Sequence, residues 1–255
     1  MQFVHRISKG SRFNQIYVPA SMNEVFEVGD LVEVRLIEKK TKIYTSCNIQ
    51  LSAFKKKLIN QILSILQRIT GIEQSFIVGS FLTSKTDYND IDILLISNKD
   101  CEKEVYSRLM TKFDLKFHVL VIPEERFQRL IKICPLTRSM LYYFVSHKHF
   151  SLPATTEIDK QHLEFLLMMP EDLLEIKANS RAYYDSWRRL LAIERFLKGE
   201  AIDNIAIIKD IERSLGKLLH TYMRSNEPLE EIHLKKIRTH MDQKIHFIRK
   251  LLRAS

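Results

Sequence analysis

Two short apolar runs, joined by a polar segment, constrain this chain more than any other feature of its sequence. The first run, residues 76–78, leads into Gly79-Ser80, and the second begins at Asp90-Ile-Asp92. Side chains of an extended strand alternate between two faces, so Asp90 and Asp92 project to one side of the second strand. Two carboxylates on one face repel each other unless a cation lies between them. The pattern predicts two strands with a cation site where the second one begins.

Each member of this pattern suits a phosphate compound that is bound together with a metal ion. Magnesium prefers oxygen ligands, and the two aspartates supply them. Gly79 lets the backbone approach a ligand closely, and the Ser80 hydroxyl with nearby amides can hold phosphate oxygens. The alternative is a plain hairpin, whose tip is rich in Asp and Asn because turns favour them. That alternative leaves the two aspartates at the head of a strand unexplained.

The arrangement resembles the nucleotidyltransferase superfamily, which includes DNA polymerase beta, the CCA-adding enzymes and the minimal nucleotidyltransferases. The shared signature is Gly-Ser, a spacer of this length and Asp-x-Asp, bracketed by strands. The resemblance implies an α+β fold in which helices flank a mixed sheet. It implies a metal-dependent enzyme that moves a nucleoside monophosphate from a nucleoside triphosphate, such as ATP, to a hydroxyl acceptor.

The resemblance also assigns roles to residues. Asp90 and Asp92 would be catalytic and would bind Mg²⁺ or Mn²⁺, while Gly79 and Ser80 would bind the phosphates of the nucleotide. Lys85, inside the spacer, is a further candidate for a phosphate contact, with a solvated loop lysine as the alternative.

The third carboxylate of the family is not clearly present. The strand predicted at residues 115–122 carries Lys116 and His118 on the face where the family has an aspartate, and the nearest acid of that parity is Asp114. Asp114 is therefore the third catalytic candidate. His118 is a candidate metal ligand, although magnesium prefers oxygen, and a half-buried structural histidine is the alternative. Because two acids hold the nucleotide-associated metal better than the catalytic one, the sequence leaves the activity of the site open.

The composition narrows the partners and the location. A length of 255 residues allows one sizeable core or two to three small ones. The net charge of +9 attracts polyanions and favours a nucleotide or a nucleic acid, DNA or RNA, as ligand. Three cysteines without paired spacing, and no apolar stretch that could span a bilayer or act as a signal peptide, predict a cytoplasmic protein without a membrane partner.

Residues 1–45 predict a small β domain. Strands are expected at residues 4–8, 14–18 and 31–38, with Gly29-Asp30 as the turn before the last one. Their order resembles the SpoVT/AbrB-like swapped-hairpin domain, which implies a homodimer formed through this segment and binding to DNA. The alternative is a hairpin extension that packs on the catalytic domain.

Residues 50–150 predict the catalytic domain. Apolar residues at helical spacing predict a helix over residues 51–70, which Gly71 is placed to end. Helices are further expected at residues 102–112 and 124–133, the second with Pro123 at its first turn.

Residues 155–255 predict a helical domain, HEPN-like or substrate-binding, with helices at 170–198, 201–224 and 229–253. Arg213 and His220 lie seven residues apart, so one helix would place them on a shared face. This spacing falls within the Arg-His motif of HEPN ribonuclease domains, and a chance pair is the alternative.

Two functions therefore remain. The first is a nucleotidyltransferase. The second is a DNA-binding or antitoxin-like regulator whose nucleotidyltransferase site is degenerate.

Overall fold

The structure is a computed structural model that describes residues 3–35, 42–46, 49–83, 88 and 90–254. These residues fall into two units, one within residues 1–39 and the other within residues 40–255. The predicted boundary between residues 50–150 and 155–255 therefore stays a prediction.

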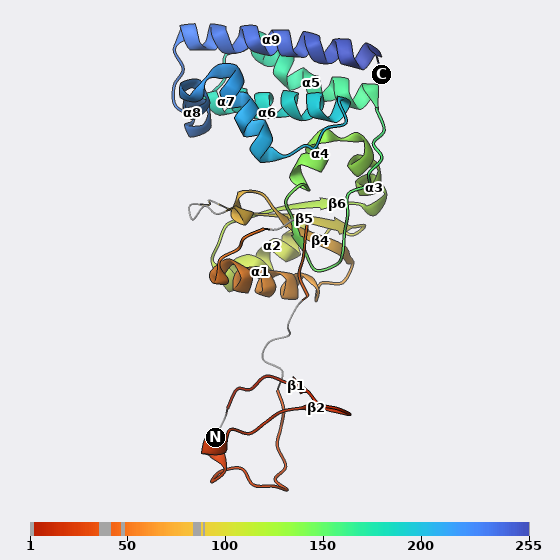
Figure 1. Cartoon of the computed structure of the whole chain (residues 1–255), viewed down its shortest axis with the longest axis vertical. Helices are drawn as coiled ribbons and strands as arrows, with labels where there is room; N and C mark the ends of the chain where they lie inside the picture. The colour runs from red at the N-terminus through yellow and green to blue at the C-terminus, as the bar shows by residue number, and fades with distance from the viewer. Residues whose placement is uncertain (1–2, 36–41, 47–48, 84–87, 89, 255) are drawn as a thin grey trace. The chain divides into compact units, whose positions relative to one another are not determined.

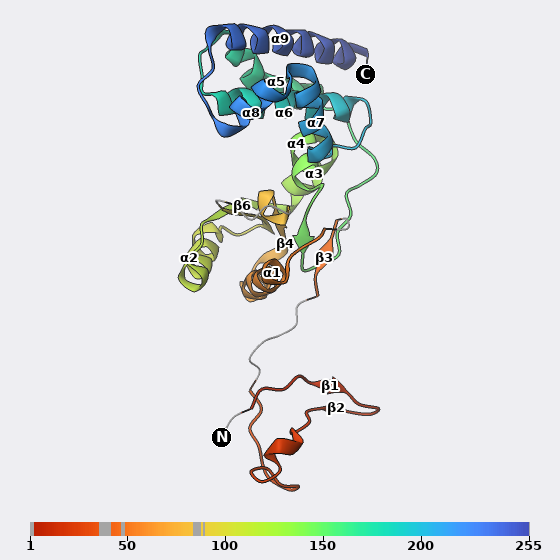
Figure 2. The same cartoon turned by 60° about the vertical axis from the view of Figure 1, so that its left-hand side comes forward.

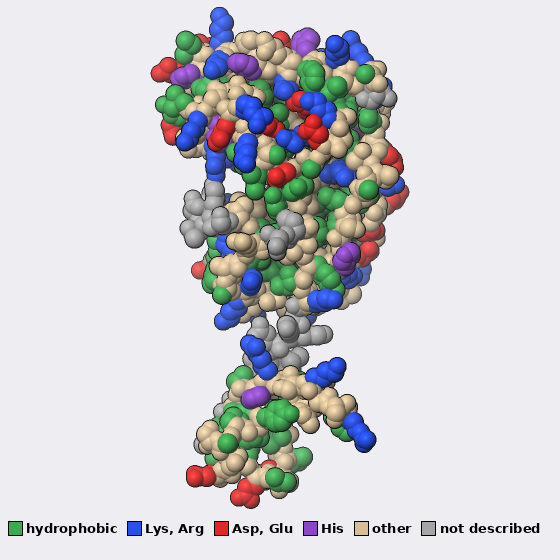
Figure 3. Space-filling model, in the orientation of Figure 1, with side chains coloured by type: hydrophobic (Ala, Val, Ile, Leu, Met, Phe, Trp, Pro, Cys, Tyr) green, Lys and Arg blue, Asp and Glu red, His purple; other side chains and the backbone are tan. Residues whose placement is uncertain are grey.

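The N-terminal unit has little regular structure in its described part. Strand β1 (Ser8–Lys9) pairs antiparallel with β2 (Asn14–Gln15), and a 3₁₀ turn, η1, spans Ala20–Met22. None of the described residues 3–35 is buried, and Leu31 is as exposed as in an extended peptide, at 101%. Figure 3 shows hydrophobic side chains on the surface of this unit.

The β-structure predicted for this unit is only partly present. The strands expected at residues 4–8 and 14–18 shrink to two residues each, and residues 31–35 form no strand. The prediction of a strand at 31–38 is therefore wrong for 31–35, and residues 36–38 lie outside the described part. Strands are stabilised by packing their side chains against one another, and the described residues of this unit form no buried core.

The second unit contains a mixed five-stranded sheet in the order β3-β7-β4-β5-β6 (Figure 1). Strands β5 and β6 are parallel, and each of the other neighbouring pairs is antiparallel. The α+β fold class is therefore confirmed, with flanking helices, a small N-terminal pair of strands and C-terminal helices. The strands are β3 (Tyr44–Thr45), β4 (Ile72–Val78), β5 (Ile91–Ser97), β6 (Phe117–Ile122) and β7 (Val145–Ser146).

Two helices, α1 (Ala53–Leu66) and α2 (Glu102–Phe113), cover one face of the sheet (Figure 2). Ile62 of α1 and Val105 of α2 are fully buried in the same core as Ile93 of β5. The helix predicted at 51–70 begins after Ser52, whose hydroxyl accepts the Lys55 amide. It ends at Leu66, before Gly71.

The opposite face of the sheet is covered over the middle and end of β5. Phe76 and Leu94 pack there against Phe127 of α3 (Glu124–Ile133) and against Phe144. Leu94 is the next residue after Asp92 on the same face of β5, and Val78, which pairs with Asp92, belongs to this cluster, so Asp92 lies at the edge of the cluster.

The C-terminal helices pack around the fully buried Trp187. The segment predicted as one helix at 170–198 is two helices, because the chain leaves helical geometry at Ile176 and Asn179 caps the next one. The segment predicted at 201–224 also divides, at Gly216, which has a φ of 88°. The helices are α4 (Pro135–Met140), α5 (Lys160–Glu175), α6 (Ser180–Leu197), α7 (Asn204–Leu215), α8 (Lys217–Ser225) and α9 (Glu231–Ala254).

Pro170 lies inside α5 rather than at the start of a helix, which sequence reasoning did not foresee. Proline has no N–H, so the carbonyl of Leu166 lacks its usual helical donor. Arg189 of α6 donates to that carbonyl at 3.3 Å. A neighbouring helix thus supplies the hydrogen bond that the local sequence removes.

Candidate active site

Gly79 fixes the turn between β4 and the rest of the motif. Its φ is +81°, a conformation that L-residues with a side chain rarely adopt. A Cβ atom at this position would stand 2.0 Å from Oδ2 of Asp92. The pairing of Val78 with Asp92 in the antiparallel ladder brings the two together. Glycine is therefore required here both by the backbone angle and by the aspartate carboxylate.

Ser80 follows at the exposed end of the turn. It begins a short 3₁₀ turn, η2 (Ser80–Leu82), whose Phe81 and Leu82 side chains are buried beneath it. The Thr83 hydroxyl donates back to the Ser80 carbonyl at 2.7 Å. These contacts hold the backbone of the turn, and Ser80 itself is exposed.

Asp92 carries an unfavourable charge. Burial raises the pKa of its carboxyl above the usual range, and the negative charge of Asp90 raises it further. A hydrogen bond and the charge of His118 act in the opposite direction without cancelling these effects. The repulsion between the two carboxylates that the sequence predicts is therefore present at the start of β5.

His118 stands beside Asp92. The parallel register of β5 and β6 pairs the two residues, and Nδ1 of His118 lies 3.2 Å from Oδ1 of Asp92. The His118 side chain is 72% exposed. The half-buried structural histidine considered as an alternative is therefore not what the structure has.

Asp114 is placed by the helix before it. It ends α2 in the left-handed conformation, with a φ of +50°, and its amide donates to the Met110 carbonyl at 2.9 Å. Across the described part of the chain, no three or more His, Cys, Asp or Glu side chains are grouped so that they could hold a metal ion. Asp114 and His118 thus complete no such group with Asp90 and Asp92.

Asp90 and Asp92 are oxygen donors that could hold one magnesium or manganese ion together with ligands from outside the protein. Magnesium is commonly held by one or two carboxylates, with substrate phosphates and water as the other ligands, and Asp90 and Asp92 match that pattern. A second ion would need a further oxygen ligand. His118 offers a nitrogen ligand instead, because Nε2 can bind a metal while Nδ1 keeps its contact with Asp92.

Two lysines near the site need separate comment, one that the sequence predicted and one that it did not. Lys85 lies outside the described residues. Lys55, which sequence reasoning missed, is buried and donates from Nζ to the Thr83 carbonyl at 2.8 Å. The signal for it was present, because Lys55 falls on the apolar stripe of α1 between Leu51 and Leu58.

The pair formed by Arg213 and His220 does not take the predicted arrangement. Gly216 separates their helices, so the prediction that they share one helix face is wrong. His220 is 3% exposed, with Nδ1 3.2 Å from Glu212, whereas Arg213 is exposed and pairs with Asp210. A ribonuclease-like Arg-His site is therefore not formed by these two residues.

Comparison with known proteins gives one structural likeness. No family model matches the sequence, and no curated protein matches it. A similar solved structure is that of spectinomycin adenyltransferase AAD(9) from Enterococcus faecialis with ATP and spectinomycin, at 10% identity and a TM-score of 0.45. The match covers 80% of this chain and 100% of that one. A likeness this distant carries no argument about the site.

None of the described helices is long and apolar enough to cross a bilayer.

Proposed function

We propose that this chain is a metal-dependent nucleotidyltransferase. It binds a nucleoside triphosphate at the Gly79-Ser80 turn and transfers the nucleoside monophosphate to a hydroxyl acceptor, with release of pyrophosphate. The observation that carries the proposal is the packing of Gly79 against the Asp92 carboxylate. That packing brings Asp92, whose pKa the charge of Asp90 raises, against the turn that continues into the exposed Ser80, a combination suited to a phosphate chain with its cation.

Each residue then has a defined task. The Ser80 hydroxyl donates to a phosphate oxygen, and the absent Cβ of Gly79 leaves room for the Asp92 carboxylate. Asp90 and Asp92 hold the magnesium ion, which supplies charge neutralisation at the reacting phosphate. His118 orients the Asp92 carboxylate through its Nδ1 contact. Asp114 remains a candidate third carboxylate only if it moves toward Asp90 and Asp92 when substrate binds.

The test is nucleotide-dependent stabilisation. Thermal unfolding is measured with each of the four ribonucleoside triphosphates, with and without magnesium. At a ligand concentration one hundred times the dissociation constant, the gain in unfolding free energy is about 2.7 kcal/mol. We expect this gain only when magnesium is present, because the like charges of Asp90 and Asp92 repel a bare triphosphate.

Two variants sharpen the test. Asp92→Asn should abolish the gain, whereas Asp172→Asn, an exposed aspartate on α5, should retain it. Equal stabilisation of the Asp92 variant and the wild type would remove Asp92 from the proposed site.

A second candidate is a DNA-binding or antitoxin-like regulator that is dimeric through its N-terminal unit. The observation that favours it is the complete lack of buried residues among the described residues 3–35. A segment with Val4, Phe13, Val28 and Leu31 exposed gains stability by covering them with a second copy.

Light scattering separates the two candidates. If the protein is the regulator, the full chain should be a dimer and residues 40–255 should be a monomer. Only the dimer should then bind an operator-like DNA duplex. A monomeric full chain that binds nucleotide and magnesium would leave the enzyme as the only candidate.

A further inference from the structure

Lys55 is a lysine in a position where the fold calls for an apolar residue. It lies on the buried face of α1, one turn before Leu58, and is 6% exposed. Burial lowers the pKa of its ammonium group, which shows that the surroundings disfavour the charge. A leucine would fill this stripe without that cost.

The ammonium group of Lys55 contacts residues of the segment between Ser80 and Asp90. Its Nζ donates to the Thr83 carbonyl at 2.8 Å, and the hydroxyl of Thr83 donates to the Ser80 carbonyl at 2.7 Å. The same ammonium lies 5.2 Å from the ring centre of Phe81 and 5.3 Å from that of Tyr88.

The rings of Phe81 and Tyr88 pack against each other next to this ammonium group. Their rings meet edge to face, with centres 4.8 Å apart. Phe81 follows Ser80 directly, and Tyr88 lies two residues before Asp90. The ammonium of Lys55 therefore sits where the two ends of the spacer meet, at a distance at which cation–π attraction acts on both rings.

We propose that Lys55 is the positioning residue of the triphosphate site. It ties the Ser80 turn and the approach to Asp90 to the rigid helix α1, and so fixes the spacing between the phosphate-binding hydroxyl and the carboxylates. This inference rests on the proposed function. Lys55 acts through the backbone and the two rings, so it need not touch the nucleotide.

The experiment compares two neutral variants of Lys55 with a matched control. Lys55→Met keeps an unbranched side chain, one atom shorter, and removes both the charge and the donor, whereas Lys55→Gln has the length of Met and retains a donor. Lys56→Met is the control, because Lys56 is the next residue of α1 and is exposed. Dissociation constants are measured for ATP and for inorganic tripolyphosphate, both with magnesium. Hydrogen exchange is followed over residues 80–90.

We expect Lys55→Met to weaken ATP and tripolyphosphate alike, by about tenfold, which is the usual weight of one charge-assisted hydrogen bond. The equal loss follows because the tripolyphosphate has no base or sugar and reports on the phosphate subsite alone. Exchange over residues 80–90 should become faster while that of α1 and β4 is unchanged. Lys55→Gln should fall between the wild type and Lys55→Met, and Lys56→Met should match the wild type.

Three results would overturn the inference. Wild-type affinity of Lys55→Met for tripolyphosphate, with faster exchange, would leave Lys55 with a structural role only. Faster exchange throughout α1 and β4 in both variants would make it an ordinary core residue. A wild type that binds neither ATP nor tripolyphosphate would defeat the proposed function and the triphosphate role together, whereas the exchange data would still report whether Lys55 restrains the segment.

Discussion

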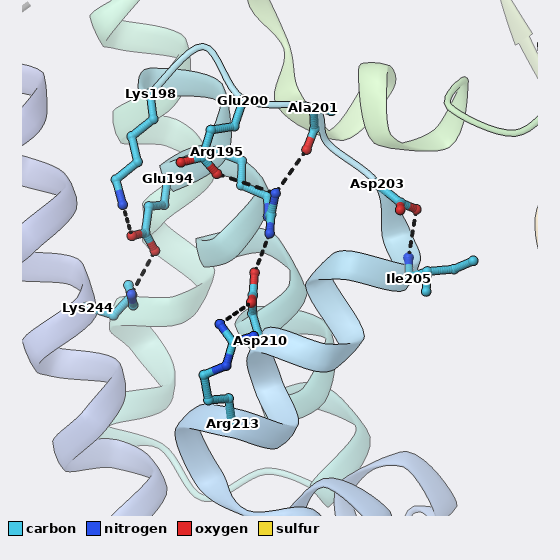
Figure 4. Close-up of polar contacts among 10 residues, drawn as sticks. All are labelled: Glu194, Arg195, Lys198, Glu200, Ala201, Asp203, Ile205, Asp210, Arg213 and Lys244. Atoms are coloured by element: carbon cyan, nitrogen blue, oxygen red, sulfur yellow. Dashed lines mark hydrogen bonds and ion pairs between the residues drawn. The ribbon is translucent and has the colours of Figure 1, made fainter.

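Two groups of charged residues in this protein differ in the charges that they bring together: opposite charges in the helical part and like charges at the start of β5. In the helical part, Glu194 accepts hydrogen bonds from Lys198 and Lys244, both at 2.7 Å (Figure 4). Burial alone would favour the neutral carboxyl of Glu194, but the two ammonium groups outweigh it and hold its pKa below the usual range. At the start of β5, burial raises the pKa of Asp92, and the charge of Asp90 raises it further.

A second group of ion pairs in the helical part also joins opposite charges. Arg195 of α6 donates to Asp210 of α7 at 2.5 Å and also pairs with Glu200 (Figure 4). Glu194 and Arg195 are therefore each paired with a side chain of opposite charge. The contrast teaches that opposite charges join helices in the helical cluster, whereas like charges meet at the start of β5, where the proposed function would place a cation.

Gly79→Ala should have the largest effect. The substitution places a Cβ 2.0 Å from the Asp92 carboxylate in a backbone conformation with φ of +81°. Backbone strain of this kind costs about 1–3 kcal/mol, and the displaced carboxylate should also end nucleotide-dependent stabilisation. Urea unfolding with and without ATP and magnesium measures both effects.

The control for this substitution is Gly199→Ala. Gly199 also has a positive φ, +67°, but a Cβ there would meet no atom within 4 Å. It should lose stability through strain alone and leave nucleotide binding intact. Equal behaviour of the two variants would mean that the contact with Asp92 has no part in the site.

Glu194→Gln should come next. The variant leaves Lys198 and Lys244 without a carboxylate, and hydrogen bonds to charged groups contribute about 1.5–3 kcal/mol. Because both lysines retain some contact with water, we expect a loss of unfolding free energy at the low end of that range. Nucleotide affinity, measured in parallel, should be unchanged. A loss of affinity would show that the two charged groups are coupled.

Asp92→Asn should change stability in the opposite direction from Glu194→Gln. It removes a like-charge repulsion, so the ligand-free unfolding free energy at pH 7 should stay equal or rise by up to about 0.5 kcal/mol. The same urea titration checks this. A marked loss would contradict the view that the Asp92 charge is unfavourable in the free protein.

The pH dependence of the two groups should differ in sign as well. The pKa of Asp92 is raised on folding, so its contribution to stability falls as the pH rises from about 4, the usual aspartate value, through the folded pKa. The pKa of Glu194 is lowered, so its contribution is present above about pH 4.3 and is lost as the pH falls through the folded value. Unfolding of wild type and of each variant between pH 3 and pH 7 separates the two curves.

Asp114→Asn should have the smallest effect. Asn tolerates the left-handed conformation at the end of α2 as well as Asp does, so stability should stay within about 0.5 kcal/mol of the wild type. Nucleotide binding should also be retained. Loss of nucleotide transfer with binding intact would instead identify Asp114 as the third carboxylate.

Local signals were enough to predict several elements. Pro123 and the apolar spacing after it predict the bounds of α3 as they occur, and α2 differs from its prediction by one residue. The apolar runs around Gly79-Ser80 predict β4 and β5, and the alternation within a strand places Asp90 and Asp92 together. These features depend on residues a few positions apart, which is why the sequence by itself determines them.

Tertiary packing decided the rest. The strands β3 and β7 have two residues each and exist only because Tyr44 pairs with Ser146, about one hundred positions along the chain. His118 meets Asp92 because of the register between β5 and β6, and Lys55 reaches Thr83 because α1 packs beneath the turn. Periodicity shows which face of an element is apolar. Only packing selects its partner and the register, because both depend on contacts between residues far apart in the chain.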